Sequence, residues 1–179
     1  MKDKLLRPGQ IIALRDYPVR NEQILKIYFR IYSEGQGGIL PPCPVIHKSS
    51  GIPHSDQKGT KARAYNALLE TFLKGHPGAE YFLLDGNHKT CAATLAFKPI
   101  PALVMEKDRD FQEAKELAKK GEIFGWHKVD KSMKDAVRNL ATHHFGTKRF
   151  MTVEEKTKYM IDDGKFPRYM VTFFRKKTI

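Results

Sequence analysis

Six consecutive residues in the middle of the chain, Asp85-Gly-Asn-His-Lys-Thr90, combine a glycine with a carboxylate, an imidazole, an ammonium group and a hydroxyl. They separate an apolar run at 81–84 from a segment of small, helix-compatible residues. Gly86 permits a backbone turn that a side chain would hinder, and the polar residues after it suit a first helical turn. The N–H groups and positive dipole end of such a turn attract anions. The sequence therefore predicts a phosphate site, formed by Gly86, Asn87, His88, Lys89 and Thr90.

Alternative interpretations of this turn stay open. It could be an ordinary strand-to-helix turn with a polar cap, and Thr90 could cap its own helix instead of contacting a phosphate. The spacing is not that of a P-loop, in which Gly, Lys and Ser or Thr are contiguous. Asp85 is the candidate for contact with a metal or a substrate hydroxyl, because Mg²⁺ is usually held by one or two carboxylates together with phosphate oxygens.

The segment resembles the ParB/sulfiredoxin superfamily, in which this turn holds nucleotide phosphates. Its nearest form is the Asp-Gly-His-His-Arg motif of the free-serine kinases, with Asn87 in place of the first His and Lys89 in place of Arg. Residues 116–124 also look like the closing helix of those kinases, whereas residues 125–128 replace the family's downstream Lys-Thr-Thr-Arg-His pattern. The resemblance covers residues 6 to 105 and is strongest around the motif.

The resemblance implies a ParB-like nucleotide-binding protein, and further a phosphotransferase or nucleotide hydrolase acting on a small hydroxyl substrate such as free serine. The implied cofactors are ATP or ADP, or CTP, with Mg²⁺. Free-serine kinases carry a Glu near the first helix, which makes Glu22 the candidate general base, with Asp16 and Glu34 as fallbacks. Such a carboxylate orients and deprotonates the substrate hydroxyl. The predicted catalytic set is Glu22, Asp85 and His88, and the predicted metal ligand is Asp85.

The alternative function is a nucleic-acid-binding module, similar to the ParB domain of partition or nuclease-type proteins. The chain has 32 Lys and Arg against 20 Asp and Glu, a formal net charge of +12 that favours polyanionic partners. This charge is spread along the chain, so a merely basic protein is an equal interpretation. The connector at 145–151 is longer than the turn of a helix-turn-helix, so weak, sequence-independent binding is expected.

Other chemistries fit the sequence less well. A sulfiredoxin needs Cys directly after the glycine, where this chain has Asn87, and Cys91 is predicted to face the core. His143 and His144 are adjacent and diverge on a helix, which disfavours a zinc site. Trp126 is expected to be buried rather than to stack on a base. Without a secretory signal or a membrane-length apolar run, the protein is expected in the cytoplasm.

A sheet with flanking helices must position these residues. Short apolar runs predict strands at 10–14, 44–47, 81–84 and 100–105, alternating with amphipathic helices. The predicted fold class is α/β (α+β), a ParB/sulfiredoxin-like small mixed sheet flanked by helices. Residues 1–128 are predicted to form this core, and 129–179 a C-terminal helical extension packed on it.

Capping residues and apolar periodicity predict helices between and after the strands. Asn21 is predicted to cap a helix whose apolar face consists of Ile24, Ile27, Tyr28 and Ile31. Capping boxes are predicted at Asp110 with Glu113 and at Thr152 with Glu155. Residues 48–61 are expected to form a mobile basic loop, and 169–174 a strand or a short helix.

Overall fold

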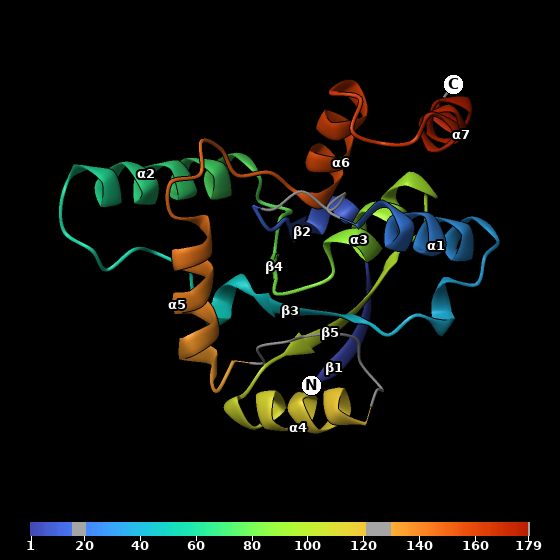
Figure 1. The fold of residues 1–179 in the computed structure, drawn as a ribbon. Coiled ribbons are helices and arrows are strands. Elements are labelled where there is room, and N and C mark those ends of the chain that lie inside the picture. The colour runs from blue at the N-terminus through green and yellow to red at the C-terminus, as the bar shows by residue number, and fades with distance from the viewer. Residues whose placement is uncertain (16–20, 121–129, 179) are drawn as a thin grey trace.

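The computed structural model describes residues 1–15, 21–120 and 130–178, and its strands form one mixed sheet of order β1-β5-β3-β4-β2 (Figure 1). The strands are β1 (Lys2–Leu6), β2 (Ile11–Ile12), β3 (Cys43–His47), β4 (Tyr81–Leu83) and β5 (Ile100–Met105). The four predicted strands are therefore present, although the first is shorter than predicted. β1 was not predicted.

The strand pairing alternates in direction across the sheet. β1 is antiparallel to β5, β5 is parallel to β3, β3 is antiparallel to β4, and β4 is parallel to β2. β3 therefore lies at the centre with β4 beside it, and the end of β4 leads directly into the predicted phosphate turn. The mixed α/β class is confirmed, and the specific ParB/sulfiredoxin-like fold stays a prediction.

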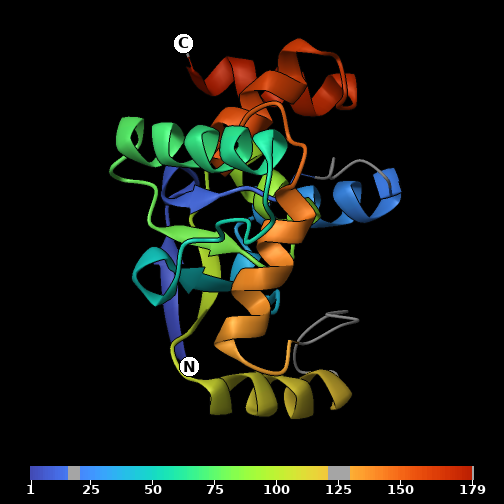
Figure 2. The same cartoon turned by 90° about the vertical axis from the view of Figure 1, so that its left-hand side faces the viewer.

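Helices cover both faces of the sheet (Figures 1 and 2). They are α1 (Glu22–Ser33), α2 (Thr60–Gly75), α3 (Asn87–Leu95), α4 (Asp108–Lys119), α5 (Met133–His144), α6 (Val153–Asp162) and α7 (Arg168–Thr178). Residues 169–174, for which strand and helix both remained open, belong to α7. The N-terminus lies near α4, and the C-terminus lies at the opposite end of the molecule, beside α6 (Figure 1).

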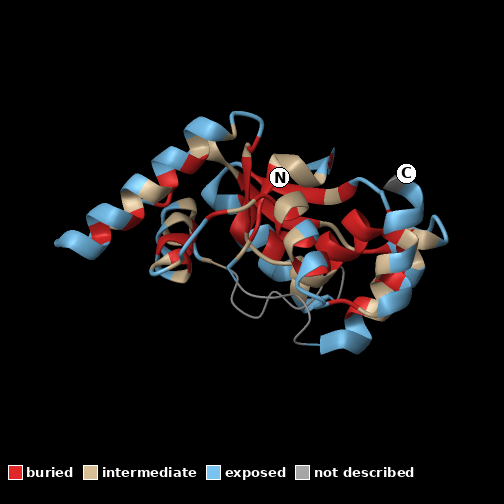
Figure 3. Cartoon of the chain, turned by 90° about the horizontal axis from the view of Figure 1, so that it is seen from above, coloured by how far each residue is buried: buried red, intermediate tan, exposed pale blue. Residues whose placement is uncertain are grey.

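Successive strand residues point to opposite faces, as the two-residue period of a strand requires. Val45, Leu83 and Val104 pack with α1, α3, α6 and α7 in one hydrophobic cluster. Their neighbours Ile46, Phe82 and Leu103 pack with α2, α4 and α5 in a second cluster. Buried residues therefore concentrate in the centre of the molecule, between helices with exposed outer faces (Figure 3).

The buried face of α1 differs from the predicted one. The buried residues are Leu25, Phe29 and Tyr32, whereas Ile27 is 57% exposed and Ile24 is 37% exposed. Asn21 does cap the helix, because its side chain accepts a hydrogen bond from the Ile24 N–H at 3.1 Å. The cap was thus predicted correctly. The predicted apolar face is wrong in part, because Tyr28 and Ile31 do pack partly buried against the core, whereas Ile24 and Ile27 are exposed.

The two predicted capping boxes have different outcomes. Thr152 Oγ1 accepts from the Glu155 N–H at 3.2 Å, and Glu155 Oε2 accepts from the Thr152 N–H at 2.8 Å, which confirms the second box. Asp110 instead lies at the third position of α4, where its carboxylate accepts from the Glu106 and Lys107 N–H groups and pairs with the α-amino group of Met1. The first box was therefore placed too late along the chain.

The basic loop at 48–61 is tied to α2 by specific hydrogen bonds. The Tyr65 hydroxyl donates to the Pro53 carbonyl at 2.8 Å, and the Ser55 N–H donates to Asn66 Oδ1 at 2.8 Å. Lys48 Nζ donates to the carbonyls of Pro77 and Ala79. These bonds fix the path of a segment that was expected to be mobile.

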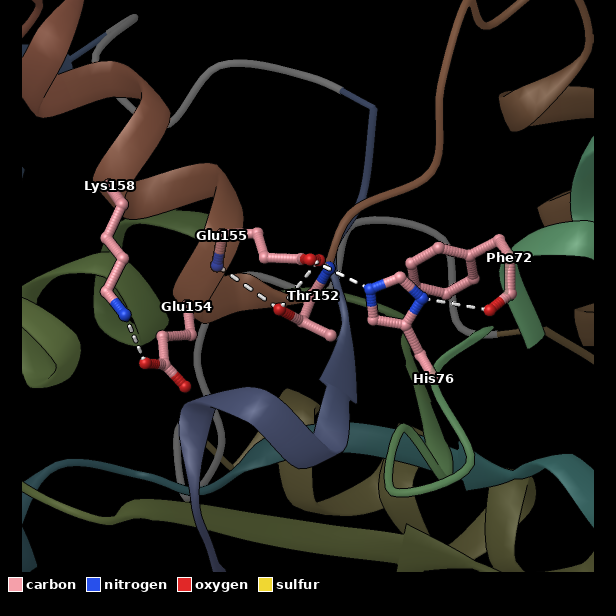
Figure 4. Close-up of polar contacts among 6 residues, drawn as sticks. All are labelled: Phe72, His76, Thr152, Glu154, Glu155 and Lys158. Carbon is pink, nitrogen blue, oxygen red and sulfur yellow. Dashed lines mark hydrogen bonds and ion pairs between the residues drawn. The ribbon is translucent and has the colours of Figure 1, made fainter. Parts of the chain in front are cut away.

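The C-terminal helices belong to both layers. α5 contributes Ala136 and Leu140 to the second cluster, while α6 and α7 contribute Met160 and Met170 to the first. Figure 4 shows a polar link from α6 to α2, in which His76 Nε2 lies 2.8 Å from Glu155 Oε1. Residues 133–178 thus contribute to both hydrophobic clusters, and the division of the chain into a core at 1–128 and a C-terminal extension stays a prediction.

Candidate functional site

The turn at 85–90 has the predicted strand–glycine–helix geometry. Asp85 Oδ1 accepts a hydrogen bond from the Gly86 N–H at 2.7 Å, and Gly86, at φ +107°, is the N-cap of α3. The Thr90 N–H donates to the Gly86 carbonyl at 2.9 Å, which closes the first helical turn. Gly86 is also close-packed, because a Cβ there would lie 2.7 Å from Cys43 Sγ. Glycine is therefore required by both conformation and space.

The N-termini of α1 and α3 meet at His88. The two helices pack against each other (Figure 1), and the Asn21 N–H donates to His88 Nε2 at 3.4 Å. The positive ends of two helix dipoles therefore lie next to each other, at residues 67 positions apart in the sequence. This arrangement strengthens the attraction for an anion beyond that of one helix N-terminus.

His88 is a half-buried imidazole whose pKa is lowered by burial, an effect that the Asp85 carboxylate opposes. The ring is therefore neutral at pH 7, and Nε2 acts as the acceptor for the Asn21 N–H. A neutral ring with this acceptor carries its proton on Nδ1. Nδ1 is thus the donor nitrogen of the ring, and the ring adds no charge to the turn.

Lys89 lies inside the protein rather than on its surface. The side chain is 5% exposed, and Nζ donates to the carbonyls of Pro41 at 2.7 Å and Pro42 at 3.4 Å. Burial raises the pKa of the neighbouring Cys43 to about 11, although the Lys89 charge opposes this. Lys89 therefore joins α3 to the connector before β3. Its positive charge acts on the turn from the protein interior.

Thr90 and Asn87 contribute differently to the turn. Thr90 is 1% exposed, and its hydroxyl donates to the Asn87 carbonyl at 3.1 Å. The hydroxyl therefore bonds within its own helix but does not cap it, because the N-cap of α3 is Gly86. Asn87 is the first residue of α3 and is partly exposed, so its amide side chain stands at the helix end that a ligand would approach.

The candidate bases have different positions. Glu22 begins α1, at the end that meets His88, and its Oε1 pairs with Lys26 Nζ at 2.5 Å. Glu34 follows the last residue of α1, about 18 Å from that end for a twelve-residue helix, and pairs with Arg30. Glu34 is therefore removed from the turn. Asp16, Trp126 and His127 lie outside the described residues.

Tyr28 is a site neighbour that the sequence pattern assigned to the core. The pKa of Tyr28 is raised by burial and then by interaction with the ionisable groups of Cys43 and Asp85, so its phenol lies within electrostatic range of the Asp85 carboxylate. The signal available in the sequence was its position nearly two helical turns after Glu22.

A metal at this turn would have to rely on Asp85. Among the described residues, no group of three or more His, Cys, Asp or Glu side chains is placed to hold a metal ion. One carboxylate fits Mg²⁺ when phosphate oxygens and water complete its coordination, which is the usual arrangement in nucleotide sites. Cys91 is buried and accepts from the Thr157 hydroxyl at 3.4 Å, so it faces the core as predicted.

Comparison of the chain with protein-family models, with curated proteins and with solved structures finds no match. Function is therefore inferred from the meeting of α1 and α3 at the glycine turn. Within the described part of the chain, no helix combines the length and the apolar character that crossing a membrane requires.

Proposed function

We propose that this protein is a ParB/sulfiredoxin-like protein that binds a nucleotide by its phosphates at the turn 85–90. The observation that carries the proposal is the hydrogen bond from the Asn21 N–H to His88 Nε2, which joins two helix N-termini at a glycine turn. Backbone N–H groups and dipoles that converge in this way favour a phosphate group. The proposal places the protein in the cytoplasm.

Each residue of the turn has a distinct role in this proposal. The first N–H groups of α3 and the Asn87 side chain bind phosphate oxygens, and His88 donates from Nδ1. Lys89 adds positive potential from beneath while it holds the Pro41 carbonyl. When bound, Mg²⁺ would neutralise phosphate charge, with Asp85 as its protein ligand.

The resemblance to free-serine kinases extends the proposal to phosphoryl transfer onto a small hydroxyl substrate. Glu22 supports this extension because it stands at the same end of α1 as Asn21. Its carboxylate would accept the hydroxyl proton once it exchanges Lys26 for the substrate. ATP, ADP and CTP are the nucleotides to compare.

A nucleic-acid-binding module is the second candidate, and the net charge of +12 favours it. The basic loop at 48–61 gives it limited support, because the Lys48 ammonium is engaged by the Pro77 and Ala79 carbonyls. The basic residues at the end of α7, Arg175 and Lys176, are exposed and remain available for phosphates.

The test is nucleotide titration by calorimetry, with Mg²⁺, of the wild-type protein and two matched variants. Asn87→Asp and Thr60→Asp each add one negative charge at the first residue of a helix that follows a glycine at positive φ. The new carboxylate favours either helix dipole, so both variants should fold. We expect Asn87→Asp to lose at least about tenfold in affinity, worth about 1.4 kcal/mol, and Thr60→Asp to bind normally.

Equal nucleotide affinity in the wild type and Asn87→Asp would contradict the proposal. If the nucleotide binds as expected, phosphate release is then measured with serine and with duplex DNA. Stimulation by serine favours the phosphotransferase, and stimulation by DNA favours the nucleic-acid module.

A further inference from the structure

The C-terminal end of α3 borders a recess of about 550 Å³, whereas the turn 85–90 lies at the N-terminal end of the same helix. The walls of the recess come from the start of the 3₁₀ turn Pro8–Gln10, the segment between α3 and β5, the first turns of α6, and α7. A helix of nine residues, about 13 Å long, separates the two places. Four lining residues present apolar rings: Pro8, Phe97, Pro99 and Phe174.

Phe97 occupies a backbone position that usually favours glycine. Among the described residues it is the one non-glycine residue with a positive φ, at +56°. The Phe97 N–H donates to the Thr94 carbonyl at 3.1 Å, and the Lys98 N–H donates to the Ala93 carbonyl at 2.9 Å. This pair of bonds ends a helix through a left-handed residue. Glycine would adopt that conformation without strain, so helix termination does not account for a phenylalanine here.

The Phe97 ring is held in place and is still accessible. Its centroid lies 4.8 Å from that of Phe174, and the two ring planes differ by 16°, so the rings are stacked. Phe174 is 9% exposed and belongs to the first hydrophobic cluster, whereas Phe97 is 43% exposed. The exposed part of the Phe97 ring therefore offers a preformed surface to the aromatic or apolar part of a ligand.

The charged side chains of the recess favour an anionic ligand. Arg7, Lys98 and Lys158 line it, and Glu154 is the one acid among the described residues that do so. Glu154 Oε1 lies 2.6 Å from Lys158 Nζ, so these two charges offset each other (Figure 4). Three cations against one carboxylate leave a positive surplus, carried by the exposed side chains of Arg7 and Lys98.

We propose that this recess binds a small aromatic carboxylate, independently of the nucleotide site at 85–90. The aromatic body stacks on Phe97, and the carboxylate accepts hydrogen bonds from the Arg7 guanidinium, whose planar fork can bind both oxygens. The volume of about 550 Å³ is within the range of small-molecule pockets, roughly 300–1,000 Å³. A monoanion fits better than a phosphate monoester, because Glu154 repels a second negative charge.

The experiment is an NMR titration of the full chain with 2-naphthoate, in the absence of nucleotide. We expect amide shifts at Thr94, Phe97 and Lys98. Two further titrations separate the contributions: 2-naphthylmethanol has the ring without the charge, and octanoate has the charge without the ring. Each should bind at least about tenfold more weakly than 2-naphthoate.

Three variants test the assigned roles. Phe97→Gly removes the ring and suits the backbone conformation, so the protein should fold while the affinity for 2-naphthoate falls at least about tenfold. Arg7→Gln should weaken binding, and Glu154→Gln should strengthen it, because the two substitutions remove charges of opposite sign. Arg63→Gln is the matched control for Arg7, since Arg63 is exposed on α2 and does not line the recess.

Absence of 2-naphthoate binding, or shifts at 85–90 instead of at the end of α3, would overturn the proposal. Equal affinity for 2-naphthylmethanol would show that the charge is not recognised, and tighter binding of octanoate would show that the ring is not; either result contradicts it. If Phe97→Gly does not fold, wild-type affinity in both Arg7→Gln and Glu154→Gln would still refute the proposal. None of these variants alters the turn 85–90, so failure here is distinct from failure of the nucleotide proposal.

Discussion

At the scale of single residues, Gly86 is held by two separate constraints: φ is +107°, and a Cβ would lie 2.7 Å from Cys43 Sγ. Gly59 has a similar φ of +114° and nothing within 4 Å of its Cβ position. Gly59→Ala should therefore cost only the backbone strain, roughly 1–3 kcal/mol. Gly86→Ala should cost roughly 1–3 kcal/mol more, from overpacking. Urea unfolding of both variants measures the difference, and equal losses would mean that the contact with Cys43 relaxes freely.

Lys89 is expected to act on stability as well as on ligand affinity. Lys89→Met keeps the aliphatic stem but leaves the Pro41 carbonyl without its charged donor, which should cost roughly 1.5–3 kcal/mol of unfolding free energy. Lys158→Met is the control, since Lys158 is exposed and pairs only at the surface. Unchanged stability of Lys89→Met would show that the ammonium is not a structural link between α3 and the Pro41 connector.

The composition of the turn could be predicted from sequence because its determinants are local: Gly86 supplies the conformation and the adjacent residues supply the helix start. The partner of Lys89 could not, because Pro41 lies 48 residues away and no spacing rule joins them. The same holds for Arg15 and Lys156, which come together only when the α5–α6 connector pairs beside β2.

At the scale of elements, α1 shows why a periodic pattern can mislead. Leu25, Phe29 and Tyr32 recur at helical spacing as regularly as the isoleucines do, so periodicity could not choose between the two faces. β1 was missed for a different reason. Its first four residues, Lys2 to Leu5, are exposed, and it adds to the edge of the sheet through backbone pairing with β5 rather than through apolar alternation.

The link between α2 and α6 should depend on pH. Burial lowers the pKa of His76, but hydrogen bonds to the Phe72 carbonyl and the Glu155 carboxylate give a net rise above 6.5. The pKa of Glu155 is shifted below 4.5, because hydrogen bonds to Thr152 and His76 outweigh burial. The His76 contribution is thus complete below pH 6.5 and lost as pH rises through its raised pKa. The Glu155 contribution is complete above pH 4.5 and lost as pH falls through its lowered pKa.

The stabilisation from this pair should therefore be greatest between pH 4.5 and 6.5. Both side chains are more than a third exposed, so its size should be less than about 1 kcal/mol. The measurement is unfolding free energy against pH for the wild type and His76→Gln. The substitution also removes the stacking of His76 on Phe72. The prediction is therefore tested by how the difference in unfolding free energy between the two proteins varies with pH. A difference that is constant from pH 4 to 9 would contradict the prediction.

At the scale of the whole molecule, the last three helices are shared between the two hydrophobic clusters. α5 completes the layer with α2 and α4, and α6 and α7 complete the layer with α1 and α3. The sequence could predict a helical extension after residue 128, with Thr152 as one of its caps. It could not predict that they divide between opposite faces of the sheet, because that depends on the path of the connector past β2.

The net charge of +12 leads to a prediction about salt that separates the two candidate functions. If nucleic acid is the partner, log affinity for duplex DNA should fall with log salt by about 0.9 for each phosphate neutralised. A nucleotide at 85–90 involves few charges, so its salt dependence should be shallow. We expect weak duplex binding, with a dissociation constant above about 1 μM at physiological salt, because the cations are dispersed along the chain. Anisotropy titrations between about 50 and 200 mM salt provide both slopes. Tight, sequence-specific DNA binding that persists at the higher salt would make the nucleic-acid module the primary function. Nucleotide binding with a shallow salt dependence, and no detectable DNA binding, would leave the turn 85–90 as the functional centre.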